Sequence, residues 1–215
     1  MDLVIFDLDG TLIDSKEDLS CAVNAARGHR GLAPLESKIV FSYVGEGAPV
    51  LIRRALGPGA SDEEVADALK FFLNYYNEHM IDHTVLYPSV RETLDRLLAA
   101  GVKLAVLTNK PVRMSRAIMQ ALGLGEHFAG VYGGNSFEQK KPHPVGIKTL
   151  MRECGANQDR TMMVGDSAVD IRTARNAQVK ACGVTYGFQP ETLAAEPPDL
   201  LVDRIEELAD WVIEP

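Results

Sequence analysis

The sequence predicts an α/β protein in which a helical segment is inserted near the start of a mostly parallel sheet. Three observations predict this fold class. From residue 102 onward, short apolar runs of strand length alternate with helical patterns. A further apolar run stands at the N-terminus, and the residues between about 15 and 82 show helical periodicity only. Alternating strands and helices form parallel sheets with right-handed crossovers, so one sheet is expected to contain the first run and the later ones.

The predicted strands are short and apolar. The runs 104–107 and 162–164 are continuously apolar, which is typical of strands that helices cover on both faces. The expected strands are Leu3–Phe6, Val102–Leu107, Gly130–Tyr132, Thr161–Val164, Val179–Val184 and Leu200–Val202.

Helices are expected between these strands. Ser89 and Glu92 have the spacing of a capping box in front of an apolar stripe, and Gly101 ends that helix. Further helices are expected at about 113–122, 145–153 and 168–176. Near the end of an acidic amphipathic segment at the C-terminus, Trp211 is expected to pack in the core.

The segment between the first two strands has its own helical pattern. Ser61 and Glu64 form a second predicted capping box, and Gly57-Pro58-Gly59 is a strong break before it. Helices are expected at about 16–27, 36–43, 48–56 and 62–80. We therefore expect residues 1–14 and 83–215 to form the α/β core and residues 15–82 to form a helical cap domain. The two connections to the cap should lie close together, as insertions require.

Composition limits the class of partner. The 215 residues carry a formal net charge of −8, which argues against nucleic acid and anionic membranes, since both reward clustered Lys and Arg. No apolar run approaches a membrane span and no signal-peptide pattern is present, and the three cysteines are far apart without a C-x-x-C pair. We expect a cytoplasmic protein. The sequence does not indicate which oligomeric state it adopts. A small anionic substrate stays compatible with the charge, because a bound divalent cation reverses the local field.

The polar residues of interest follow the predicted strands. In open α/β sheets, ligands bind outside the carboxyl ends of the strands, so one pocket could gather these residues. Two adjacent carboxylates in a dry site require a cation or a proton, so the pattern points to a metal, a phosphoryl group or both. The candidates are Asp7, Asp9, Thr108, Asn109, Asp166 and Asp170, together with Lys141 in the loop before Pro142.

Four short motifs occur in an order that resembles the haloacid dehalogenase superfamily of aspartyl-phosphate phosphatases. They are Asp7-x-Asp9-Gly10-Thr11, Thr108-Asn109, Lys141 before Pro142, and Gly165-Asp166-Ser167-x-x-Asp170. The resemblance covers nearly the whole chain and implies a Rossmann-like three-layer core, and the insert matches the helical-cap subgroup. Within the cap, Val44-Gly45-x-Gly47 followed by Arg54-Ala55-Leu56 is similar to phosphoglycolate phosphatases.

The resemblance implies a magnesium-dependent phosphomonoester hydrolase that acts on a small phosphorylated metabolite. Asp7 would be the nucleophile and Asp9 the general acid and base. Thr108 and the backbone amide of Asn109 would bind a phosphoryl oxygen, and Lys141 would neutralise charge. The implied Mg²⁺ ligands are Asp7, the backbone carbonyl of Asp9, Asp166 and Asp170, the last directly or through water. Arg53 or Arg54 of the cap would meet a distal anion of the substrate.

Alternatives remain open. Asp9-Gly10 could mark a hairpin turn, although no partner strand follows. The acid at Asp9 favours phosphoryl transfer over dehalogenation, but a sugar phosphomutase similar to β-phosphoglucomutase, or a pyrophosphatase, would share the core residues. From another class, a phospho-accepting signalling domain would carry its acceptor on a later strand and would leave the insert unexplained. A noncatalytic binding protein would be expected to lack one of the four motifs.

Overall fold

The computed structural model describes residues 1–213 and divides into two compact units. The core unit contains Met1–Asp14 and the chain from Leu86 onward, and the cap unit contains Ser15–Val85. The core unit is a parallel sheet flanked by helices, which confirms the predicted fold class. Within residues 1–213, no helix has both the length and the apolar character needed to cross a membrane.

The core sheet has six strands in the order β5-β4-β1-β6-β7-β8, and its neighbours pair in parallel. Each predicted strand is found within two residues of its expected bounds. The strands are β1 (Leu3–Phe6), β4 (Lys103–Leu107), β5 (Gly130–Tyr132), β6 (Thr161–Gly165), β7 (Lys180–Val184) and β8 (Leu200–Val202).

The register of β1 decides where the candidate residues emerge. Phe6 is level with Val106 of β4 on one side and with Val164 of β6 on the other. The backbone N–H of Asp7 donates to the carbonyl of Val164 at 2.9 Å. The residues that follow β1, β4 and β6 therefore start at the same edge of the sheet.

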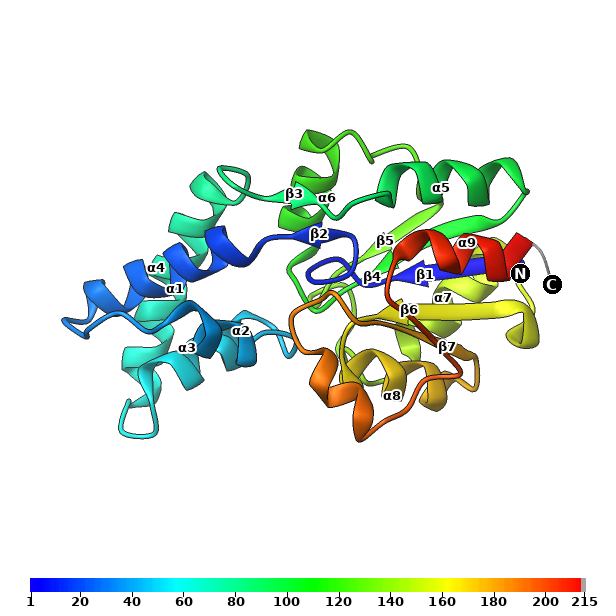
Figure 1. Cartoon of the computed structure of the whole chain (residues 1–215). Helices are drawn as coiled ribbons and strands as arrows, with labels where there is room; N and C mark the ends of the chain where they lie inside the picture. The colour runs from blue at the N-terminus through cyan, green and yellow to red at the C-terminus, as the bar shows by residue number, and fades with distance from the viewer. Residues whose placement is uncertain (214–215) are drawn as a thin grey trace. The chain divides into compact units, whose positions relative to one another are not determined.

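Helices cover both faces of the core sheet. Helices α5 and α9 pack against each other on one face, and α7 and α8 pack against each other on the opposite face (Figure 1). Alternate strand residues such as Leu3, Ile5 and Met163 are fully buried in the cluster that also contains residues of α7 and α8. The core helices are α5 (Val90–Ala99), α6 (Val112–Ala121), α7 (Val145–Cys154), α8 (Ala168–Ala177) and α9 (Ile205–Ile213).

Two sequence predictions about these helices are wrong. Ser89 precedes α5 but has a left-handed backbone (φ 61°), and its side chain makes no capping hydrogen bond. A capping serine normally has an extended backbone that directs its oxygen at the third amide of the helix. The left-handed backbone of Ser89 therefore prevents the predicted capping box. Trp211 is 37% exposed rather than part of the core, and Lys180 Nζ lies 4.9 Å from the centre of its ring. Leu208 and Val212 supply the buried face of α9 instead.

The cap unit is helical, as its sequence pattern predicts. Helix α4 packs against α1 and α3, and α1 also packs against α2. The capping box of Ser61 and Glu64 is confirmed, because the Ser61 hydroxyl accepts from the Glu64 N–H and the Glu64 carboxylate accepts from the Ser61 N–H. The helices are α1 (Lys16–His29), α2 (Ser37–Ser42), α3 (Ala48–Leu56) and α4 (Asp62–His79). The short strands β2 (Ile13–Asp14) and β3 (Val85–Leu86) pair with each other.

Asp18 joins the two ends of the cap segment. This carboxylate lies in the first turn of α1 and is 2% exposed. Oδ1 accepts from the N–H of His83 at 3.0 Å and lies 2.8 Å from His83 Nδ1. Oδ2 accepts from the N–H and the hydroxyl of Thr84 at 2.9 and 2.7 Å. Burial alone would raise the pKa of Asp18, but the hydrogen bonds from Thr84 and His83 lower it below its ordinary value.

Replacing Asp18 by Ala should destabilise the protein. The change leaves the buried N–H of Thr84 without its acceptor, so we expect the free energy of unfolding to fall by about 2–4 kcal/mol in urea denaturation. Asp82→Ala is the matched control, because Asp82 is exposed in the same connection and should cost less than about 1 kcal/mol. Equal losses for the two variants would show that the Asp18 hydrogen bonds do not hold this connection.

Candidate active site

Three buried carboxylates meet at the carboxyl edge of the sheet. Asp7 follows β1, Asp166 follows β6, and Asp170 lies in the first turn of α8. One oxygen of each lies within 4.8 Å of one oxygen of each of the others. The three residues are 7%, 4% and 0% exposed, so water screens their mutual repulsion poorly.

Lys141 neutralises part of this charge. Its Nζ lies 2.9 Å from Asp7 Oδ1 and 2.6 Å from Asp170 Oδ1. Burial alone would lower the pKa of Lys141, but the carboxylates of Asp170 and Asp7 raise it well above its ordinary value. One ammonium against three carboxylates leaves two uncompensated negative charges when all are ionised.

Burial and the remaining negative charge raise the pKa of two carboxyl groups. Burial, together with the nearby charge of Asp170, raises the pKa of Asp7 to about 6 although Lys141 opposes it. Burial, Asp170 and Asp7 together raise the pKa of Asp166 to about 8. In the protein alone, therefore, Asp166 is mostly protonated near neutral pH, whereas Asp7 is still mostly ionised there but loses its proton at a higher pH than an ordinary carboxyl group.

Backbone groups hold Asp166 in place. Its Oδ2 accepts from the N–H of Phe188 at 2.6 Å and from the N–H of Gln189 at 3.3 Å. Gly10 packs against the same carboxylate: a Cβ there would lie 2.3 Å from Asp166 Oδ2, and its φ of +82° also requires glycine. Sequence reasoning missed the 188–189 loop, because backbone donors are present in every residue type except proline and carry no signal in the sequence.

Asp170 has a structural contact besides its place in the cluster. Its Oδ2 accepts from the Ser167 hydroxyl at 2.8 Å and from the Ser167 N–H at 3.2 Å, while Oδ1 contacts Lys141. Asp170 therefore helps to begin α8 and faces the carboxylate cluster at the same time.

Thr108 and Asn109 follow β4 at the same edge of the sheet, and both are buried. The Thr108 hydroxyl oxygen accepts from the N–H of Lys110 at 3.3 Å, which leaves the hydroxyl hydrogen to donate elsewhere. The Asn109 side chain bonds the backbone of Lys141 twice, donating to its carbonyl at 3.1 Å and accepting from its N–H at 3.0 Å. This side chain fixes the loop that carries Lys141, a role that sequence reasoning did not foresee.

Asp9 is paired with a second buried lysine that the sequence analysis missed. Lys110 Nζ donates to Asp9 Oδ1 at 2.8 Å and to Oδ2 at 3.1 Å. The side chain of Lys110 is 5% exposed and that of Asp9 is 12% exposed. Its place in the sequence could have indicated this role. Lys110 directly follows Thr108-Asn109 at the end of a predicted strand, close to the predicted acidic residues that could pair with a buried cation.

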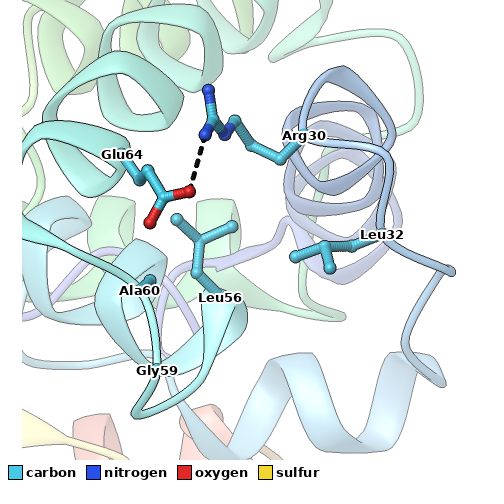
Figure 2. A pocket seen from close by; sticks show the side chains of 6 residues that line it. All are labelled: Arg30, Leu32, Leu56, Gly59, Ala60 and Glu64. Atoms are coloured by element: carbon cyan, nitrogen blue, oxygen red, sulfur yellow. Dashed lines mark hydrogen bonds and ion pairs between the residues drawn. The ribbon is translucent and has the colours of Figure 1, made fainter.

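The cap residue Arg54 lies on α3, where its guanidinium pairs with Glu46, and Arg53 pairs with Asp62. Their suggested contact with substrate stays a prediction. Figure 2 shows a pocket within the cap unit whose two charged residues bind each other, Arg30 Nη2 lying 2.9 Å from Glu64 Oε1. Because these two charges neutralise each other, the pocket is poorly suited to bind a charged ligand. It is lined by Arg30, Leu32, Leu56, Gly59, Ala60 and Glu64.

The donor set of the cluster fits a hard divalent cation. Asp7, Asp166 and Asp170 offer carboxylate oxygens, the ligand type that Mg²⁺ prefers, close enough together to share one ion. The double positive charge of such a cation would balance the two negative charges that Lys141 leaves uncompensated. The raised pKa values of Asp7 and Asp166 are the effect expected of such a site when no cation is present.

Comparison with known proteins agrees with this geometry. The family model of the haloacid dehalogenase-like hydrolases matches residues 4–184. A phosphoglycolate phosphatase of Vibrio vulnificus (strain CMCP6) is 40% identical over 220 residues, covering 98% of this chain and 96% of the relative. A phosphoglycolate phosphatase of Chromobacterium violaceum is 40% identical over 216 residues, covering 96% of this chain and 94% of the relative.

A solved structure extends the likeness to the fold. The crystal structure of a predicted phosphoglycolate phosphatase from Haemophilus somnus 129PT superposes with a TM-score of 0.92 at 33% identity, covering 98% of this chain and 97% of that one. The chain therefore belongs to the haloacid dehalogenase-like hydrolases, as the four motifs predicted.

The buried carboxylates should make stability depend on pH when divalent ions are removed. Their folded pKa values of about 6 and 8 lie above the unfolded value of about 3.9, so between pH 4 and pH 8 the folded state binds more protons than the unfolded state. The free energy of unfolding should therefore fall as the pH rises through this range, by roughly 1 kcal/mol per pH unit between pH 6 and pH 8 and by about twice that below pH 6, where both groups contribute. Urea denaturation in EDTA measures the slope.

Asp166→Asn isolates this effect from that of other titrating groups. The variant cannot ionise at residue 166, so its stability relative to the unchanged protein should rise steadily from pH 5 to pH 8. A difference that stays constant over this range would show that Asp166 is not forced into its neutral form.

Proposed function

We propose that this hydrolase is a magnesium-dependent phosphomonoester phosphatase that works through an aspartyl-phosphate and that phosphoglycolate is its substrate. The observation that carries the proposal is the buried cluster of Asp7, Asp166 and Asp170, with Lys141 in contact with two of them. Phosphoryl transfer requires an in-line nucleophile and concentrated positive charge, and this cluster can supply both when a cation is bound.

Asp7 is the proposed nucleophile. Its carboxylate lies directly after the central strand β1, and its Oδ1 lies 2.9 Å from the ammonium of Lys141, so the nucleophile stands beside a positive charge before substrate arrives. Attack by Asp7 on phosphorus would split hydrolysis into formation and breakdown of an acyl phosphate. The negative charge of Asp170 repels that of Asp7, and the ammonium of Lys141, which contacts both carboxylates, reduces this repulsion.

Asp7, Asp166 and Asp170, with the backbone carbonyl of Asp9, would hold the metal ion. When bound, Mg²⁺ would neutralise the carboxylates and lessen the repulsion between Asp7 and an incoming phosphate dianion. The two N–H groups that bind Asp166 Oδ2 orient that carboxylate and leave its other oxygen for coordination.

The loop after β4 would bind the phosphoryl group. The Thr108 hydroxyl is buried and has a hydrogen to donate, and Lys141 stands beside the nucleophile to balance charge on the transferred group. Asp9 would protonate the leaving oxygen and later accept a proton from the attacking water.

The proposed substrate rests on the relatives. Those at 40% identity over nearly the whole chain are named phosphoglycolate phosphatases. A β-phosphoglucomutase structure from Clostridium difficile has a TM-score of 0.80 at 20% identity, which shows a shared fold alone and gives the mutase no support. Comparing kcat/KM across a panel of metabolite phosphates, with sugar phosphates and pyrophosphate included, separates these activities.

Replacing the proposed nucleophile should abolish turnover. The unchanged protein should release phosphate from phosphoglycolate and from p-nitrophenyl phosphate only with Mg²⁺ present, and Asp7→Asn should lower kcat by about 10³-fold or more. Free phosphate is the measured product.

Asp159→Asn is the control for the loss of one acidic group, because Asp159 is exposed and lies before β6 rather than after it. It should keep full activity. Undiminished phosphate release by Asp7→Asn would exclude an aspartyl-phosphate on this residue, and activity of the unchanged protein in EDTA would exclude the metal requirement.

A further inference from the structure

We propose that Lys110 is the positioning residue of Asp9: its ammonium orients the Asp9 carboxyl group for proton transfer to the leaving oxygen. The inference rests on the proposed function, since it deepens the role of the acid and base. It assigns the two buried lysines separate tasks. Lys141 serves Asp7 and Asp170, and Lys110 serves Asp9.

The contact between Lys110 and Asp9 has the geometry of an orienting interaction. The ammonium bonds both carboxylate oxygens, at 2.8 and 3.1 Å, which restrains rotation of the carboxyl group as a single bond would not. Both side chains are largely removed from water, so the pair is weakly screened and its loss would leave a buried charge. A surface ion pair would not restrain either side chain in this way.

The loop that carries Lys110 is held by hydrogen bonds and close backbone packing, which suits an orienting residue. The Lys110 N–H bonds Thr108 Oγ1, and its carbonyl accepts from the N–H of Gly134 at 2.9 Å. The loop after β5 packs directly on this backbone: a Cβ on Gly134 would lie 2.3 Å from the carbonyl oxygen of Asn109. The Asn109 side chain ties the same segment to the loop of Lys141.

This loop would fix the position of the Asp9 carboxyl group relative to the bound phosphoryl group. Thr108, the proposed ligand of the phosphoryl group, and Lys110, the partner of Asp9, are two residues apart on one constrained segment. A phosphoryl group held by Thr108 would therefore stand at a fixed place relative to the Asp9 carboxyl group. Misplacement of a reacting group by about 1 Å can lower a rate by about 10²-fold.

The proton balance is simple. As an Asp7 oxygen bonds to phosphorus, the bond from phosphorus to the ester oxygen breaks, and its electron pair stays on that oxygen. The Asp9 proton moves to the same oxygen, so a neutral alcohol leaves and Asp9 becomes a carboxylate. A protonated Asp9 keeps only its carbonyl oxygen as an acceptor, so the ammonium of Lys110 would hold the acid through one oxygen and the carboxylate through both.

Leaving groups of different acidity test the proposal. Proton transfer matters most when the leaving alkoxide is strongly basic, and little for p-nitrophenolate. Ethyl phosphate and p-nitrophenyl phosphate are suitable because neither ester carries a charged group besides its phosphoryl group, so Lys110 has no distal anion of the substrate to bind. Lys110→Met should lower kcat/KM by about 10²-fold for ethyl phosphate and by less than about 10-fold for p-nitrophenyl phosphate.

The same substitution is then made in an Asp9→Asn background. If Lys110 acts through Asp9, removing it after Asp9 is gone should change kcat/KM for ethyl phosphate by no more than a few-fold. Lys110→Arg, which keeps a cation, should recover part of the ethyl phosphate activity. Lys148→Met is the matched control, because Lys148 is exposed on α7, and it should leave both substrates unaffected.

Three results would overturn the proposal: equal losses for both substrates, no loss for either, or a full loss that persists in the Asp9→Asn background. The last result would mean that Lys110 acts on substrate directly. Thermal unfolding of each variant monitors the fold, and Lys110→Gln replaces Lys110→Met if the methionine variant does not fold. An unchanged protein that releases no phosphate from phosphoglycolate or from either ester would instead refute the proposed function, which keeps the two failures distinct.

Discussion

Repulsion among three buried carboxylates is the constraint on which the rest of this structure depends. Asp7, Asp166 and Asp170 lie within 4.8 Å of one another, where two like charges repel by about 4 kcal/mol even in a partly polar interior. Lys141 removes part of the cost, and hydrogen bonds to Asp166 and Asp170 remove more. Burial, together with the repulsion that remains, raises the pKa of Asp7 and Asp166, so the folded chain favours positive charge at this point.

The parallel sheet makes such an arrangement possible. Its central strand β1 lies between β4 and β6, so three loops from distant parts of the sequence begin side by side. One loop contributes Asp7 and Asp9, the second Thr108 and Lys110, and the third Asp166. The glycine at residue 10 allows the first loop to lie directly against the third. The two buried lysines lie beside carboxylates at this edge of the sheet: Lys110 contacts Asp9, and Lys141 contacts Asp7 and Asp170.

The sequence predicted the strands and the carboxylate cluster because both have strong local signals: continuous apolar runs, and acidic residues where those runs end. It could not predict contacts that depend on the tertiary arrangement. The amides of Phe188 and Gln189 bind Asp166 without any side-chain signature, and Lys110 looked like an ordinary loop lysine until its burial beside Asp9 was visible. Ser89 had the right type and spacing for a cap, but its left-handed backbone overrode that preference.

The most direct measurement of the central claim is an anomalous-difference map from a crystal of this protein grown with Mn²⁺ as a substitute for Mg²⁺. We expect one strong peak among the three carboxylates, at about 2 Å from an oxygen of Asp7 and from an oxygen of Asp166. Asp170 should lie at the same distance or be separated from the ion by one water. A map without a peak among these residues, at a Mn²⁺ concentration that saturates activity, would contradict the claim that the cluster exists to hold a divalent cation.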